Sequence, residues 1–335
     1  MSTYKYIYIL DSGAYGGGGE ALYQLGCDLL DKGIDVQIVQ LDSRKSIPIK
    51  FNKYVSKGLE IISPDRILDK EDNLLIVPEA NTGFLFDYIK IKKAIWWLSF
   101  DNSDCFFHWN KTEKFISNLW NQKKVNFWLL KQFAHNLFFH HRLHFNLNEA
   151  INLSGSHYAQ KCLLERYGIK SIPFIHSIGR DFLDAGMYVS QENRNNVVLY
   201  NPAKPSALTK YLIRRGKFKY VPIQGMSFKE LLDLFRSSKL YIDFGNFPGP
   251  ERLPKETVFN GVNILVWKHN AAATDDVCIP DTFKVDPDAD IQSIENKIAE
   301  MLHNYDRDFS SFSSFRNMIM CMEDNYYKQL DNIFD

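Results

Sequence analysis

The chain has 335 residues, of which 45% are hydrophobic and 24% are charged, and its formal net charge is zero. This length suggests two domains, and the balanced charge argues against a nucleic-acid partner. The five widely spaced cysteines form no C-x-x-C pair, which fits a reducing compartment better than a disulfide framework or a zinc site. The sequence has neither a signal-peptide core at its start nor an apolar run long enough to span a membrane, so a cytoplasmic protein is expected.

The first 42 residues predict a strand–helix–strand unit. The strands are expected at 4–11 and 35–42, and the helix at 20–33 follows a glycine-rich loop, 12–19. Such a unit predicts a parallel sheet. Two later apolar runs, 73–79 and 94–101, are typical of strands buried on both faces.

A second α/β set begins near residue 195. Its strands are expected at 196–200, 218–223, 239–244 and 263–267, and its helices at 207–216 and 225–239, followed by two helices within 291–333. Ser227 and Glu230 have the spacing of a capping box at the start of the second helix.

The predicted fold class is therefore α/β, with two facing Rossmann-like domains and a cleft between them. We expect an N-terminal domain at 1–185 and a C-terminal domain at 186–310. A last helical segment, 311–335, either stays with the second domain or crosses back to the first. Ligands of such sheets lie outside the carboxyl ends of the strands. This rule singles out the loops 12–19, 79–83, 101–105, 201–206 and 245–256.

The glycine-rich loop is a candidate phosphate site. Glycines such as Gly17 and Gly18 let main-chain N–H groups approach a ligand, and the start of a helix favours anions. The alternative is a flexible crossover loop. The same loop matches the dinucleotide pattern G-x-G-x-x-A, with Asp42 at the end of the second strand, but residues 12–15 intervene after the first strand, which disfavours a dehydrogenase.

Charged residues follow two strands of the second set. Lys204 lies on an extended turn before a proline, where it either neutralises a diphosphate or is merely solvated. The stretch 244-FGNFPGPERLPKETVFNG-261 combines a turn around Gly249 with a helix start that carries Arg252, Lys255 and Glu256. A carboxylate there can accept bonds from two vicinal ribose hydroxyls, or simply complement the helix dipole. The two cations either bind phosphate or pair with neighbouring acids.

These segments resemble the donor loop of GT-B glycosyltransferases. The residues 241-YIDFGNFPGPERLPKE-256 match, at nearly every place, the pattern Y-[IV]-D-F-G-x-x-P-G-x-[DE]-R-x-P-[RK]-E of a bacterial subgroup that builds surface polysaccharides. Further matches are 97-WLSFDN-102, 154-SGSHYAQKCL-163, 200-YNPAKPS-206 and 271-AAATDDVCIP-280. The sequence departs from the E-x₇-E signature of many retaining members, because Pro248 stands where the first glutamate would be.

The resemblance implies that the C-terminal domain binds a nucleotide-sugar, UDP- or GDP-linked, and that the N-terminal domain binds a saccharide or lipid-linked acceptor. No cofactor and no metal are expected, since the sequence has no D-x-D at a strand end. An inverting enzyme needs a base for the acceptor hydroxyl. Asp101 is the favoured candidate and Glu79 the second, although each could instead cap a following turn, and a retaining enzyme would need no base.

Residues 114–148 contain no acid, five Lys and Arg, and many aromatics. Such a segment either lies on the inner face of the plasma membrane, which would make the protein peripheral there, or forms a packed helix pair. Other functions also remain open for the whole chain: a nucleotide-sugar epimerase of the same fold, or a non-catalytic binding subunit.

Overall fold

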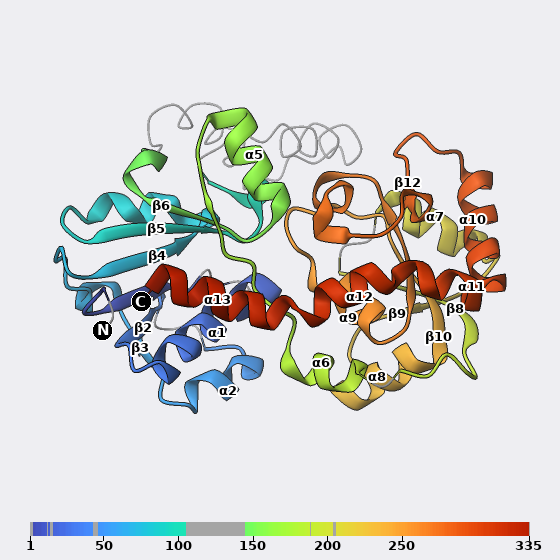
Figure 1. The fold of residues 1–335 in the computed structure, drawn as a ribbon, viewed down its shortest axis with the longest axis horizontal. Coiled ribbons are helices and arrows are strands. Elements are labelled where there is room, and N and C mark those ends of the chain that lie inside the picture. The colour runs from blue at the N-terminus through green and yellow to red at the C-terminus, as the bar shows by residue number, and fades with distance from the viewer. Residues whose placement is uncertain are drawn as a thin grey trace, which may run out of the picture. The chain divides into compact units, whose positions relative to one another are not determined.

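The computed structural model describes residues 3–11, 13, 16–42, 46–104, 145–187, 189–203 and 206–334 (Figure 1). Contacts divide the chain into two compact units. The first comprises Met1–Gly155, Ala159–Pro173 and Ile333–Asp335, and the second comprises Ser156–Tyr158 and Phe174–Asn332.

The contacts place the main change of unit at Phe174, whereas the sequence placed it after residue 185. Helix α6 (Arg180–Gly186) accounts for the difference, because it packs on the second unit. A Cβ atom on Gly186 would lie 2.3 Å from a ring carbon of Phe259. The last three residues group with the first unit.

The described strands of the first unit form a seven-stranded parallel sheet in the order β3-β2-β1-β4-β5-β6-β7. They are β1 (Ile7–Leu10), β2 (Val36–Val39), β3 (Glu60–Ile62), β4 (Leu74–Pro78), β5 (Lys92–Trp97), β6 (Ile151–Ser154) and β7 (Ile172–Pro173). The central strands β1 and β4 are buried along their whole length, as their uninterrupted apolar sequences predict.

Helices cover both faces of this sheet. They include α1 (Gly17–Asp31), α2 (Asn52–Val55) and α5 (His157–Tyr167). In Figure 1, α5 lies above β4, β5 and β6, and α1 and α2 lie below these three strands. Helix α1 begins at Gly17, three residues before the expected start, so that Gly17 and Gly18 belong to its first turn.

The described strands of the second unit form a five-stranded parallel sheet in the order β12-β11-β10-β8-β9. They are β8 (Asn195–Tyr200), β9 (Lys219–Pro222), β10 (Ser238–Asp243), β11 (Asn263–Trp267) and β12 (Lys284–Val285). The two parallel-sheet units confirm the α/β class and the two-domain division expected from the sequence.

The remaining helices of the second unit are α7 (Ala207–Arg215), α8 (Phe228–Ser237), α9 (Arg252–Phe259), α10 (Ile291–His303), α11 (Tyr305–Phe309), α12 (Ser313–Met320) and α13 (Met322–Phe334). The capping box is confirmed at the start of α8, where Ser227 and Glu230 bond each other's main-chain N–H groups. The C-terminal segment was expected to hold two helices, but the described residues after 290 form four.

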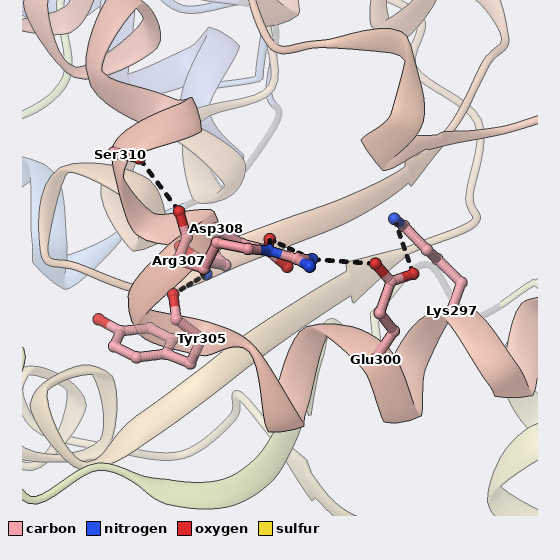
Figure 2. A network of polar contacts seen from close by, with 7 residues as sticks. Lys297, Glu300, Tyr305, Arg307, Asp308 and Ser310 are labelled. Carbon is pink, nitrogen blue, oxygen red and sulfur yellow. Dashed lines mark hydrogen bonds and ion pairs between the residues drawn. The ribbon is translucent and has the colours of Figure 1, made fainter.

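A polar network joins α10 to α11 (Figure 2). The guanidinium of Arg307 bonds Glu300 and Asp308, each at 2.9 Å, and Lys297 pairs with Glu300 at 3.2 Å. Because Arg307 is 62% exposed, these ion pairs contribute little on their own. Their structural effect is to fix the turn that carries Tyr305, which reaches the site described below.

Candidate functional site

Each sheet has one point at which the order of its strands reverses. In the first unit this point lies between β1 and β4, and in the second it lies between β8 and β10. Open parallel sheets bind ligands in the crevice beyond the carboxyl ends of the strands at such a point. The loops that follow these four strands are therefore the candidate binding loops, and each contains residues that the sequence singled out.

The loop after β10 is packed into the second unit. Asp243 ends the strand and accepts bonds from the Tyr241 hydroxyl at 2.7 Å and from the Gly245 N–H at 3.0 Å. Pro248 and Gly249 are both buried. The Gly249 carbonyl accepts the N–H of Glu251 at 2.9 Å, which closes a tight turn just before α9. The glycines and prolines of this stretch thus shape a rigid turn instead of a solvated loop.

Helix α9 carries the three charged candidates of the second unit. Nε of Arg252 lies 3.6 Å from Oε1 of Glu256, and each side chain is only 12% exposed. A terminal nitrogen of Arg252 also lies 3.3 Å from the position that a Cβ on Gly179 would occupy. The structure therefore brings Arg252, Lys255 and Glu256 together on one short, largely buried helix.

Lys255 is the most deeply buried of the three, at 3% exposure. Burial lowers the pKa of its ammonium to about 8, and the neighbouring acids, led by Asp276, do not offset this burial. The charge of a buried lysine is costly unless an anion compensates it. A phosphate group is an anion of suitable size and charge.

Asp276, in the matched segment 271–280, is a structural residue of the second unit. Its two carboxylate oxygens accept the N–H groups of His157 and Tyr158, each at 2.9 Å, and the Thr274 hydroxyl bonds it at 2.8 Å. These bonds satisfy the first turn of α5.

The carboxyl end of α9 is fixed by a buried arginine. Arg194 donates to the carbonyl oxygens of Asn260, Phe235 and Ser238 at 3.2, 2.7 and 2.9 Å. The Tyr305 hydroxyl bonds the Gly261 carbonyl at 2.6 Å. The side-chain amide of Asn260 in turn bonds the Glu256 carbonyl at 2.9 Å. Sequence reasoning missed Arg194, because its bonds to Phe235, Ser238 and Asn260 reach main-chain carbonyls far along the chain and leave no motif, while its remaining bonds go to the nearby Ser190 carbonyl.

In the first unit, Asp11 directly follows β1 and organises the start of the glycine-rich loop. It accepts the Gly13 N–H at 2.9 Å and the Tyr23 hydroxyl at 3.1 Å. Helix α1 then begins with Gly16 as its N-cap residue. The first N–H groups of a helix have no partner within the helix, so the amides of Gly17 and Gly18 are oriented as an anion site would require.

Glu79 and Asp101 follow β4 and β5. Glu79 is 4% exposed, and burial raises the pKa of its carboxyl to about 7 despite the main-chain N–H bonds that it accepts. Asp101 does not end a strand as expected, because β5 stops at Trp97 and Asp101 lies in the 3-10 turn Phe100–Asn102. Asp101 is partly exposed, whereas Glu79 is enclosed.

Two predicted features lie outside the described residues. One is Lys204, in the loop after β8, and the other is the acid-free segment 114–148, of which only 145–148 are described. Their proposed roles remain predictions.

None of the described helices is long and apolar enough to cross a membrane. In the described part of the chain, no three His, Cys, Asp or Glu side chains gather into a group that could hold a metal ion.

Solved structures with the same fold are glycosyltransferases. A complex of S. aureus TarM with UDP superposes with a TM-score of 0.63 at 8% identity, covering 98% of this chain and 99% of that one. WaaG, a glycosyltransferase involved in lipopolysaccharide biosynthesis, superposes with a TM-score of 0.59 at 10% identity. The match covers 98% of this chain and 99% of that one. Anabaena HepE in complex with UDP-glucose superposes with a TM-score of 0.58 at 11% identity. The match covers 98% of this chain and 100% of that one. The chain therefore has the GT-B fold. No protein-family model and no curated protein matches the sequence.

Proposed function

We propose that this protein is a glycosyltransferase that moves a sugar from a nucleotide-sugar to a saccharide or lipid-linked acceptor in bacterial polysaccharide assembly. The observation that carries the proposal is the buried cluster of Arg252, Lys255 and Glu256 on α9, beyond the carboxyl end of β10. Two of the structures with this fold hold UDP or UDP-glucose, and one acts in lipopolysaccharide biosynthesis, which supports the same chemistry here.

The α9 cluster suits a nucleoside diphosphate. We assign Glu256 to the ribose hydroxyls, since a carboxylate can accept two hydrogen bonds from a vicinal diol. Arg252 and Lys255 are assigned to the diphosphate, together with the turn at Gly249. Arginine suits phosphate through its fork of donors, and the buried ammonium of Lys255 gains an anionic partner. Fixed cations in a buried site stabilise the charge that develops on the leaving diphosphate.

The remaining donor contacts are proposed from the amides of Gly17 and Gly18 and from Lys204. Since these cations and amides would neutralise the diphosphate, we propose a metal-independent reaction without a cofactor, and a UDP- or GDP-linked donor. Asp101 is proposed as the base that takes the acceptor proton in an inverting reaction. Asp101 is the more exposed of the two candidate acids.

Binding and turnover test this function together. We expect one nucleotide among UDP, GDP and CMP to raise the melting temperature of the wild-type protein, and the matching nucleotide-sugar to release free nucleotide when an acceptor is supplied. An epimerase would instead produce an isomeric nucleotide-sugar. A binding subunit would be stabilised without any turnover. If none of the nucleotides stabilises the protein, the proposed donor site is wrong.

Membrane contact through residues 114–148 is a separate proposal, supported by their composition and by the use of lipid-linked acceptors at membrane surfaces. We expect the protein to pellet with anionic vesicles at low salt, and the double variant Lys123→Glu/Lys124→Glu to pellet less. Equal pelleting with neutral and anionic vesicles would contradict it.

A further inference from the structure

The carboxylate of Glu79 is fully engaged by main-chain groups of another strand's loop. Oε2 accepts the N–H of Leu98 at 2.9 Å, and Oε1 accepts the N–H of Ser99 at 3.0 Å. These two residues come directly after β5, so the side chain at the end of β4 holds the peptide at the end of the neighbouring strand.

Two glycines enclose the same peptide. A Cβ on Gly18, in the first turn of α1, would lie 3.7 Å from the Leu98 side chain. A Cβ on Gly155 would lie 3.3 Å from Cα of Leu98 and 2.9 Å from the Trp97 carbonyl, which is closer than real side chains approach. The Gly155 N–H also bonds that carbonyl at 3.0 Å. Three segments of the first unit thus converge on Leu98.

The position of the Leu98–Ser99 peptide determines the position of Asp101. The N–H of Asn102 bonds the carbonyl of Ser99 at 2.8 Å and closes the turn that contains Asp101. Farther along, the N–H of Asp104 bonds the Glu79 carbonyl at 3.0 Å. The Asp104 carboxylate accepts hydrogen bonds from the Thr82 hydroxyl and the Gly83 N–H. The loop 98–104 is therefore tied at both ends to the segment that begins with Glu79.

We propose that Glu79 is a positioning residue, whose carboxylate fixes the Leu98–Ser99 peptide and thereby the position of Asp101. Because Glu79 is only 4% exposed and each of its oxygens bonds a main-chain N–H group, we assign it this role and keep Asp101 as the candidate that takes the acceptor proton. The catalytic consequence rests on the proposed glycosyl transfer, whereas the positioning itself does not.

A pH dependence distinguishes this role from simple packing. Burial raises the pKa of Glu79 above the 4.5 of an exposed glutamate, to about 7, and the nearby carboxylate of Asp104 raises it further. Asp104 is the charged neighbour that acts on Glu79 in the described part of the chain. When the loop opens, Glu79 regains its ordinary pKa. The closed loop is therefore favoured most below pH 4.5, and this preference weakens as the pH rises through 7.

Hydrogen exchange of the full-length protein tests the proposal without any nucleotide or sugar. In the wild type, we expect the protection factors of the Leu98 and Ser99 amides to fall about tenfold or more between pH 5.5 and 8.5, after correction for intrinsic exchange. In Glu79→Gln, protection should already be low at pH 5.5 and independent of pH, because the amide nitrogen cannot accept a hydrogen bond, whereas the hydroxyl oxygen of a protonated carboxyl still can.

Asp69 offers a matched control at the other end of β5. Its carboxylate accepts the N–H groups of Ile89, Lys90 and Ile91 at 3.0, 2.9 and 2.8 Å. Burial opposes its ionisation, but these bonds outweigh burial and lower its pKa. Asp69→Asn keeps one accepting oxygen, so it should lower the protection of at least one of those three amides and leave the protection of Leu98 and Ser99 unchanged.

Unchanged protection of Leu98 and Ser99 in Glu79→Gln would overturn the proposal. If that variant does not fold, a pH titration of the wild-type amide chemical shifts tests the proposal. The shifts of Leu98 and Ser99 should change with one midpoint near pH 7. Shifts that do not change near that pH would refute the proposal. Once a donor is known, Glu79→Gln should lower kcat more than it changes the donor KM. A loss of turnover with protection intact would instead identify Glu79 as the base.

Discussion

Arg252 and Glu256 lie one helical turn apart on α9, with Nε of the guanidinium 3.6 Å from Oε1 of the carboxylate. Both side chains are largely buried, at the carboxyl edge of the second sheet. The ion pair holds each charge in a defined place. In the proposed complex, Arg252 would bind the phosphates and Glu256 would bind the ribose hydroxyls.

Arg252→Ala should weaken binding of the preferred nucleoside diphosphate by about ten- to hundredfold, since a hydrogen bond to a charged group is worth about 1.5–3 kcal/mol. Affinity for the nucleoside without phosphates should change little. Arg252→Lys should restore part of the loss because it keeps the charge without the fork of donors. Calorimetric titration of each variant measures these differences. Equal losses for nucleoside and diphosphate would place Arg252 away from the phosphates.

Lys255→Met should stabilise the ligand-free protein at pH 7 and reduce its stabilisation by nucleotide. The pKa of Lys255 falls from 10.5 to about 8 in the folded protein. Each pKa unit is worth about 1.4 kcal/mol, so keeping the charge buried at neutral pH costs on the order of 3 kcal/mol. The unfolded chain holds this proton more tightly, so the free energy of unfolding of the wild type should rise between pH 8 and 10.5.

Denaturant unfolding as a function of pH checks this prediction. The rise above pH 8 should be absent in Lys255→Met. Lys229→Met, at an exposed position on α8, is the control that should leave the pH dependence unchanged. The same rise in both variants would show that Lys255 is not its source.

Arg194→Ala should destabilise the second unit by about 3–5 kcal/mol, because it leaves several buried carbonyl groups without a donor and removes a packed side chain. It should also weaken nucleotide binding indirectly, since Arg194 fixes the end of α9 through Asn260. Arg214→Ala, at an exposed position on α7, should change the unfolding free energy by about 0.5 kcal/mol or less. Urea denaturation compares the two, and equal costs would contradict the role given to Arg194.

Asp276→Asn should destabilise the protein by about 1–3 kcal/mol, because an amide nitrogen cannot accept one of the two N–H groups at the start of α5. Asp275, next to it and exposed, supplies the control, since Asp275→Asn removes the same charge without those bonds. Thermal unfolding of both variants tests this prediction. If Asp275→Asn costs as much, net charge and not helix capping is responsible.

Much of the sheet architecture could be predicted from the sequence, because central parallel strands such as β4 and β11 are uninterrupted apolar runs. The edge strands β3, β7 and β12 were missed, since two or three paired residues leave no periodicity to detect. The end of β5 was placed too late. The apolar run continues through Phe100, but the N–H groups of Leu98 and Ser99 bond Glu79 instead of a neighbouring strand.

In the candidate site, too, local features could be predicted from the sequence and long-range contacts could not. Arg252, Lys255 and Glu256 could be proposed together because they lie close in sequence at a helix start, and the structure places all three on α9. Residues whose partners lie far along the chain were not understood. Glu79 was proposed from its place at a strand end as the second candidate base, and its bonds to Leu98 and Ser99 were not foreseen. The capping role of Asp276 depends on a helix more than a hundred residues earlier.

Binding of a nucleoside diphosphate at α9 is the central claim, and titration calorimetry with UDP and GDP tests it most directly. The wild type should bind one of them, Glu256→Gln should bind it at least about tenfold more weakly, and Glu251→Gln, which alters an acid of the same loop, should bind it nearly as the wild type does. Wild-type affinity in Glu256→Gln, or no binding of either nucleotide to the wild type, would contradict the account.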